Sequence, residues 1–155
     1  MVTVEEAIDH IRVRPYMGSI SRDKTRTKQT EEFFTPSWVV CRSLGLIEEN
    51  DSGAFNDETK TFLDPCCGDG QFLGEILIKK LEAGQNFETA LSTLYGIDIM
   101  KDNIDECRSR LLCGQEHLRH IVERNVICTN GLEYDYSFNG TNKTDEEAQF
   151  DSLFG

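Results

Sequence analysis

The stretch that decides the fold runs from Thr61 to Leu73 and reads Thr-Phe-Leu-Asp-Pro-Cys-Cys-Gly-Asp-Gly-Gln-Phe-Leu. Its first residues form a short apolar segment typical of a buried strand, and Pro65 ends that strand because proline cannot donate to a β-ladder. Gly68 and Gly70 follow, and the absence of a Cβ lets their backbone N–H groups approach a ligand. A helical pattern begins directly behind them. The stretch therefore predicts a strand, a glycine loop and a helix in succession.

The spacing of these glycines excludes two common phosphate-binding loops. A dinucleotide-binding loop has glycine at a third position, where this chain has Leu73, and a P-loop needs a Gly-Lys pair that is absent here. The stretch instead resembles the first motif of S-adenosylmethionine-dependent methyltransferases, in the Asp-Pro-x-Cys-Gly-x-Gly form of DNA amino-methylases. An ordinary strand-to-helix turn of an α/β domain is the alternative that this loop alone leaves open.

A second segment lies upstream, at residues 30–36, and reads Thr-Glu-Glu-Phe-Phe-Thr-Pro before an apolar helical pattern over residues 37–46. It resembles the Thr-Gly-Glu-x-Phe-Thr-Pro element of adenine methylases, with Glu31 where that family usually has glycine. The resemblance implies that Phe34 and Thr35 lie at the methionine end of the cofactor. The alternative is a plain helix start, with Thr35 as the N-cap and Pro36 at the first helical position.

A third segment, Thr93 to Met100, predicts a second buried strand that ends in an acid. An acidic side chain at the carboxyl end of a strand, beside a glycine loop, can accept hydrogen bonds from both ribose hydroxyls. We therefore expect Asp98 to bind the ribose and Ile99 to pack on the adenine. The alternative for Asp98 is that it caps the helix that follows.

A fourth segment, Asn125 to Leu132, resembles the third strand of the family and the polar residue behind it that reads the adenine amino group. The family mostly has Asp at that place, whereas this chain has Asn130. An amide can accept from the amino group and donate to a ring nitrogen. The alternative is a simple Asn-Gly turn.

Together the four segments cover roughly residues 25–155 in the order that the family requires. The resemblance implies an α/β, Rossmann-like methyltransferase fold with a parallel, doubly wound sheet, incomplete at about four strands. In such a sheet the ligand crevice lies at the carboxyl ends of the strands. The residues implied for binding S-adenosylmethionine are Phe34, Thr35, Asp64, Pro65, Cys66, Gly68, Gly70, Asp98, Ile99 and Asn130.

The catalytic motif of the family is missing from this sequence. Phe150 to Gly155 resembles the strand that leads into an Asn/Asp-Pro-Pro-Tyr/Phe tetrapeptide, which holds the flipped target base, but the only prolines are Pro15, Pro36 and Pro65. We therefore assign no catalytic residue. The chain is expected to be the cofactor-binding part of a DNA adenine-N6 methyltransferase. The alternative is a non-catalytic S-adenosylmethionine-binding module or a subunit of a split methylase, paired with a second chain or with itself through an uncovered sheet edge.

Charge is unevenly distributed along the chain, whose net charge is −12. Residues 1–30, with a helical pattern from Val4 to about Ile11, form an expected N-terminal helix and basic arm, ahead of a partial methyltransferase-like domain at 31–155. The arm can contact DNA phosphates, or it can be a solvated segment. Its cations are Arg12, Arg14, Arg22, Lys24, Arg26 and Lys28.

The six cysteines include no Cys-x-x-Cys pair, so the sequence predicts no zinc site. No signal-peptide pattern or membrane span is visible in the sequence. A reducing cytoplasmic location is the expectation that fits these observations.

Overall fold

The structure, a computed structural model, describes residues 2–13 and 35–140 of the chain. The helices and strands within these ranges alternate in the order that the sequence predicts for an α/β fold. They are α1 Val4–Val13, α3 Ser37–Asn50, β1 Phe62–Asp64, α4 Gln71–Glu82, α5 Phe87–Ser92, β2 Leu94–Asp98, α6 Lys101–Leu112, the short 3₁₀ helix η2 Glu116–Leu118, α7 Arg119–Asn125 and β3 Val126–Cys128.

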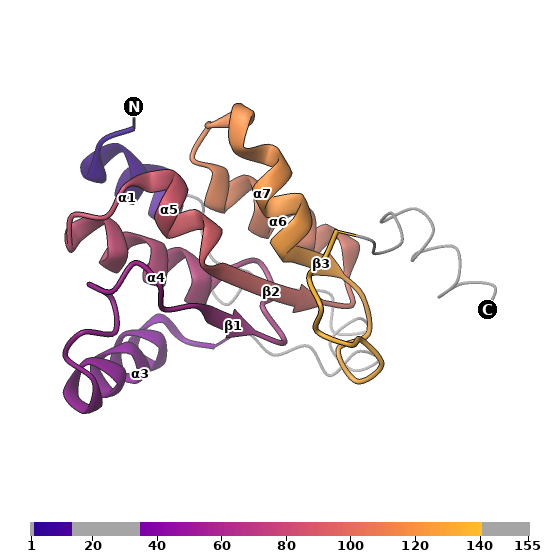
Figure 1. The fold of residues 1–155 in the computed structure, drawn as a ribbon, viewed down its shortest axis with the longest axis horizontal. Helices are drawn as coiled ribbons and strands as arrows, with labels where there is room; N and C mark the ends of the chain where they lie inside the picture. Colours follow the sequence, from indigo (N-terminus) through magenta and orange to yellow (C-terminus); the bar gives the residue numbers. More distant parts are fainter. Residues whose placement is uncertain (1, 14–34, 141–155) are drawn as a thin grey trace.

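The three described strands form one parallel sheet in the order β1-β2-β3. Asp64 is in register with Gly96, and Asp98 is in register with Cys128, so all three strands end along the same edge. In Figure 1 the strands lie side by side, and α4, α5, α6 and α7 lie above them. The mixed α/β class and the parallel sheet are confirmed. The expected fourth strand, within Phe150 to Gly155, lies outside the described residues.

The two faces of the sheet bury different sets of side chains. Successive residues of a strand point to opposite faces, and Leu94 belongs to the large core that contains side chains from every α-helix described, whereas Ile97 belongs to a separate small cluster. That second cluster is covered by Tyr134 and Phe138, from the segment after β3. Within the described residues, helices therefore cover one face, and an aromatic segment covers part of the other.

Helix α1 packs into the large core instead of forming a separate N-terminal unit. Ala7 and Ile11 are fully buried, and α1 contacts both α4 and α6. The guanidinium of Arg12 forms two hydrogen bonds, of 3.1 and 2.8 Å, with the carboxylate of Glu75 on α4. Helix α1 thus shares one core with the helices of residues 35–140.

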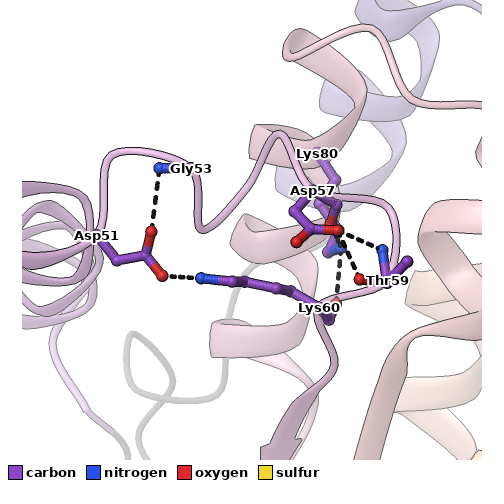
Figure 2. Close-up of polar contacts among 6 residues, drawn as sticks. All are labelled: Asp51, Gly53, Asp57, Thr59, Lys60 and Lys80. Atoms are coloured by element: carbon purple, nitrogen blue, oxygen red, sulfur yellow. Dashed lines mark hydrogen bonds and ion pairs between the residues drawn. The ribbon is translucent and has the colours of Figure 1, made fainter.

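The connection from α3 to β1 is fixed by a buried lysine of α4 (Figure 2). The ammonium group of Lys80, which has no solvent exposure, donates to the carbonyl oxygen of Lys60 at 3.0 Å and lies 5.4 Å from the ring centre of Phe62. Burial lowers the pKa of Lys80. The side chain of Lys60 pairs with Asp51, whose carboxylate also accepts from the amide of Gly53. These contacts set where β1 begins, and hence where it delivers Asp64.

Candidate functional site

A cavity of about 580 Å³ lies at the carboxyl ends of the strands. The segments that surround it are the residue before the N-cap of α3, the loop after β1 with the start of α4, the end of β2 with the start of α6, and the loop after β3. Of the predicted cofactor residues, Gly70 does not line it and Phe34 lies outside the described part of the chain. All the others do line it: Thr35, Asp64, Pro65, Cys66, Gly68, Asp98, Ile99 and Asn130.

The glycine loop requires glycine for two different reasons. Gly68 and Gly70 have φ angles of 53° and 88°, in the left-handed region that other residues rarely adopt. A Cβ at Gly70 would lie 2.7 Å from the Sγ of Cys107 and 3.2 Å from its Cα, both on α6. A contact of Gly70 with the cofactor stays a prediction. The missing side chain of Gly70 lets α6 pack against the loop, and Gly68 is the glycine that lines the cavity.

Asp98 ties the end of β2 to the glycine loop. Its Oδ2 accepts from the amide of Gly68 at 3.1 Å. Its Oδ1 accepts from the amide of Met100 at 2.8 Å and from the Asn103 side chain at 3.2 Å. A carboxylate offers about four acceptor positions, so three donors leave room for one further hydroxyl rather than two. The N-cap of α6 is Met100, without a side-chain cap, so Asp98 is not the N-cap residue of this helix.

Asp64 places a second carboxylate beside Asp98 in the cavity wall. Its Oδ1 accepts from the amide of Cys66 at 3.1 Å. Burial raises the pKa of Asp64, and the neighbouring charge of Asp98 raises it further, against the opposing effect of the Cys66 hydrogen bond. Burial and the same two carboxylates raise the pKa of the Cys66 thiol. The wall is thus electronegative and suited to a ligand that carries positive charge.

Thr35 reaches the cavity without capping a helix. The residue at the N-cap of α3 is Pro36, the helix begins at Ser37, and no side chain caps it. The N-cap interpretation of Thr35 is therefore wrong. The start of α3 is held instead by Gln71 of α4, whose side-chain amide donates to the Ser37 hydroxyl at 3.0 Å. Because Gln71 follows the glycine loop directly, this bond fixes two cavity walls to each other.

Asn130 forms the turn that the sequence offered as an alternative. Its Oδ1 accepts from the amide of Leu132 at 3.0 Å. A Cβ on the following Gly131 would lie 3.3 Å from the carbonyl oxygen of Pro65, so the loop after β3 closely approaches the loop after β1. The hydroxyl of Tyr136 donates to the carbonyl oxygen of Gly131 at 2.8 Å and braces the turn. Asn130 combines a turn-forming role with a place in the cavity wall.

The cavity lining also includes exposed apolar side chains. Ile99 is 62% exposed and Leu132 is 97% exposed, and both line the cavity together with Tyr136. Exposed apolar side chains in a concave site favour a flat apolar ligand surface. Sequence reasoning assigned no role to Leu132 or Tyr136. The alternation of aromatic residues at 134, 136 and 138 is the pattern that could have pointed to them.

The predicted DNA-contacting cations are described only in part. Arg12 lies at the end of α1 and is paired with Glu75, so part of its charge is neutralised within the protein. The other five arm residues, Arg14, Arg22, Lys24, Arg26 and Lys28, lie outside the described residues.

Within residues 2–13 and 35–140, none of the helices has the length and apolar character needed to cross a membrane. Comparisons of this chain with protein-family models, with curated proteins and with solved structures found no match.

Proposed function

We propose that this chain binds S-adenosylmethionine in the cavity at the strand ends, as the cofactor-binding part of a DNA adenine-N6 methyltransferase. One observation carries the proposal. Four segments that resemble successive cofactor motifs, and that are far apart in the sequence, line a single cavity. Three of the segments follow strands of one parallel sheet, whose carboxyl ends share an edge, and Thr35, ahead of α3, joins them in the lining.

The chemistry of the cavity wall fits the parts of that cofactor. S-adenosylmethionine has a sulfonium and an ammonium group, and the carboxylates of Asp64 and Asp98 supply negative charge where the strands end. The remaining acceptor position of Asp98 suits one ribose hydroxyl. Ile99 and Leu132 offer apolar surface to the adenine ring. The volume of about 580 Å³ lies within the usual range of small-ligand pockets, roughly 300–1,000 Å³.

When bound, the cofactor supplies an electrophilic methyl group for an exocyclic amine. The residues of this chain bind and orient it: Asp98 holds the glycine loop, and the Asn130 turn closes the cavity against Pro65. The 155 residues contain no Asn/Asp-Pro-Pro sequence to hold a target base. We therefore assign this chain cofactor binding and no catalytic residue.

Isothermal titration of the full chain with S-adenosylmethionine tests the proposal. Asp98→Ala should weaken binding by about tenfold or more, since a hydrogen bond to a charged group contributes about 1.5–3 kcal/mol. Asp105→Ala is the matched control, because Asp105 is an exposed acid on α6 that pairs with Lys101 outside the cavity. Absence of binding by the parent chain, or equal binding by Asp98→Ala, would refute the assignment.

The second candidate function is a non-catalytic S-adenosylmethionine-binding module or a subunit of a split methylase. Incubation of the purified chain with tritiated S-adenosylmethionine and unmethylated DNA tests whether the chain alone transfers a methyl group. We expect no incorporation above a blank without protein, because positioning of the target amine accounts for roughly 7–11 kcal/mol of the barrier. Incorporation that Asp98→Ala abolishes would show that the chain is a complete enzyme.

A further inference from the structure

A buried arginine of α6 joins the glycine loop to the N-terminal helix. Arg110 has no solvent exposure, and Asp69, between the two loop glycines, is 1% exposed. The Nε of Arg110 donates to the Asp69 carbonyl oxygen at 2.9 Å, and its Nη2 lies 3.3 Å from the Asp69 carboxylate. Its Nη1 donates to the carbonyl oxygen of Ile11, in α1, at 2.6 Å. One guanidinium group therefore holds both segments.

The geometry of these contacts is specific to arginine. A guanidinium has several N–H donors in a planar fork, whereas a lysine has a single ammonium group. Here the guanidinium group contacts two backbone carbonyl oxygens and one carboxylate. Glu106, one turn earlier on α6, lies 3.6 Å from Nη2 and adds negative charge. A buried guanidinium that loses one of these partners is left partly unpaired in a site that excludes water.

The loop is thereby held from both sides. On the cavity side, Asp98 accepts from the amide of Gly68. On the core side, Cys107 packs against Gly70, and Arg110, three residues further along α6, holds the carbonyl oxygen of Asp69. Because Asp69 itself lines the cavity, a movement of its peptide group would change the shape of the proposed cofactor site.

Helix α1 is docked through contacts that end at the same arginine. Ala7 and Ile11 are buried against the core, Arg12 pairs with Glu75 of α4, and the ring of His10 lies 3.2 Å from the Ser109 carbonyl oxygen of α6. Loss of α1 would remove the Ile11 carbonyl acceptor from Arg110. The guanidinium would then shift towards other acceptors and pull on the Asp69 peptide.

We infer that Arg110 is a positioning residue for the glycine loop and that, through it, docking of α1 controls the affinity of the cofactor site. The effect on affinity rests on the proposed function. Coupling is reciprocal, so ligand binding at the loop also stabilises the docked α1.

Hydrogen exchange of the ligand-free chain tests whether Arg110 holds the glycine loop in place. In Arg110→Lys, and in the smaller change Asp69→Asn, peptides spanning residues 64–72 should exchange about tenfold faster, within the ordinary range of coupling. The matched control is Arg108→Lys. Arg108 is also buried on α6, but it donates to the carbonyl oxygen of Val126, away from the loop. Equal loop exchange in Arg110→Lys and Arg108→Lys would overturn the inference.

The role of α1 is tested by undocking it. Ala7→Glu places a charge at a fully buried position, and Arg12→Ala removes the ion pair with Glu75. Both should speed exchange of the loop, Arg12→Ala less so, whereas Asp9→Ala on the exposed side of α1 should not. Faster exchange in α1 with an unchanged loop in both variants would overturn the coupling.

Titration of the same variants with S-adenosylmethionine completes the test. Asp69→Asn and Arg12→Ala should raise the dissociation constant, Arg108→Lys should leave it unchanged, and saturating ligand should slow exchange in α1. If the parent chain binds no S-adenosylmethionine, the proposed function fails, but the exchange measurements still decide whether Arg110 and α1 hold the loop.

Discussion

Single side chains at the strand ends carry most of the proposed site, and each serves the protein's own structure as well. Asp98 holds the glycine loop, and Asn130 forms a turn. Substitutions at these positions therefore alter both the shape of the cavity and its contacts with a ligand. Substitutions of Asp64 and Gly70, measured in the ligand-free chain, report the structural effect alone.

Asp64→Asn should raise the stability of the ligand-free chain at neutral pH. Burial raises the pKa of Asp64, so its charged form costs free energy above that raised pKa. The cost disappears below the pKa of an unfolded Asp, about 3.9, because both states are then protonated. The stabilisation by Asp64→Asn should thus be full at pH 7 and shrink towards pH 3.5, as measured by thermal unfolding. A shift in melting temperature that does not vary with pH would contradict this account.

Gly70→Ala should destabilise the fold by more than backbone strain alone. Overpacking typically costs about 1–3 kcal/mol, and the new Cβ would meet Cys107. Gly84→Ala is the matched control, because Gly84 also has a positive φ, of 91°, but has open space around its Cβ position. Urea unfolding should show a larger loss for Gly70→Ala, and Cys107→Ala should recover part of it. Equal losses at the two glycines would exclude the contact with α6.

At the scale of elements, the segment after β3 packs against the sheet with some side chains and lines the cavity with others. Phe138 and Tyr134 cover Ile97 and Ile127 on the second face of the sheet. Leu132 and Tyr136 face the cavity. Tyr136 and Phe138 have positive φ angles, 56° and 43°. The backbone therefore turns tightly here and directs some side chains to the sheet and others to the cavity.

Phe138→Ala should lower the free energy of unfolding by about 3 kcal/mol, at the low end of the range for buried Phe→Ala changes. Leu132→Ala should leave stability unchanged, since Leu132 is almost fully exposed, but should weaken binding of S-adenosylmethionine. Urea unfolding and calorimetric titration measure the two effects. Loss of stability in Leu132→Ala, or none in Phe138→Ala, would contradict the division of roles.

For the chain as a unit, the packing of α1 changes how the basic arm must be tested. Deletion of the first 28 residues would remove Ala7 and Ile11 from the core, so a loss of DNA binding could reflect unfolding. Replacement by Gln of the arm cations outside α1 leaves the sequence of α1 unchanged: Arg14, Arg22, Lys24, Arg26 and Lys28.

If the arm contacts DNA, that replacement should flatten the dependence of binding on salt. Each phosphate contact contributes about 0.9 to the slope of log affinity against log salt concentration. Arg12→Gln is the internal comparison, and it should have a smaller effect per residue because Arg12 is paired with Glu75. Filter binding of duplex DNA over a series of salt concentrations measures the slopes. If the salt dependence is unchanged after the five-residue replacement, the arm does not contact DNA and the interpretation as a solvated segment holds.

Local sequence patterns were sufficient for much of the fold, because the signals for strands, turns and helices are short in range. The Asp-Pro and Gly-x-Gly sequences predicted where β1 ends and α4 begins, and the glycine at position 84, with a φ of 91°, lies just after the end of α4. The segment from residue 115 to 125 gave no clear pattern, and η2 and α7 were missed there. The sequence also determined the charge and the absence of the Pro-Pro motif.

Tertiary packing determined what the candidate residues do, because their partners are far away along the chain. Gly70 is required by Cys107, and the Asp69 peptide is held by Arg110, which also binds α1. No local pattern encodes these contacts, which depend on where α6 crosses the loop. The sequence thus specified the segments that form the cavity, whereas packing specified which side chains face the cavity and which support the loop.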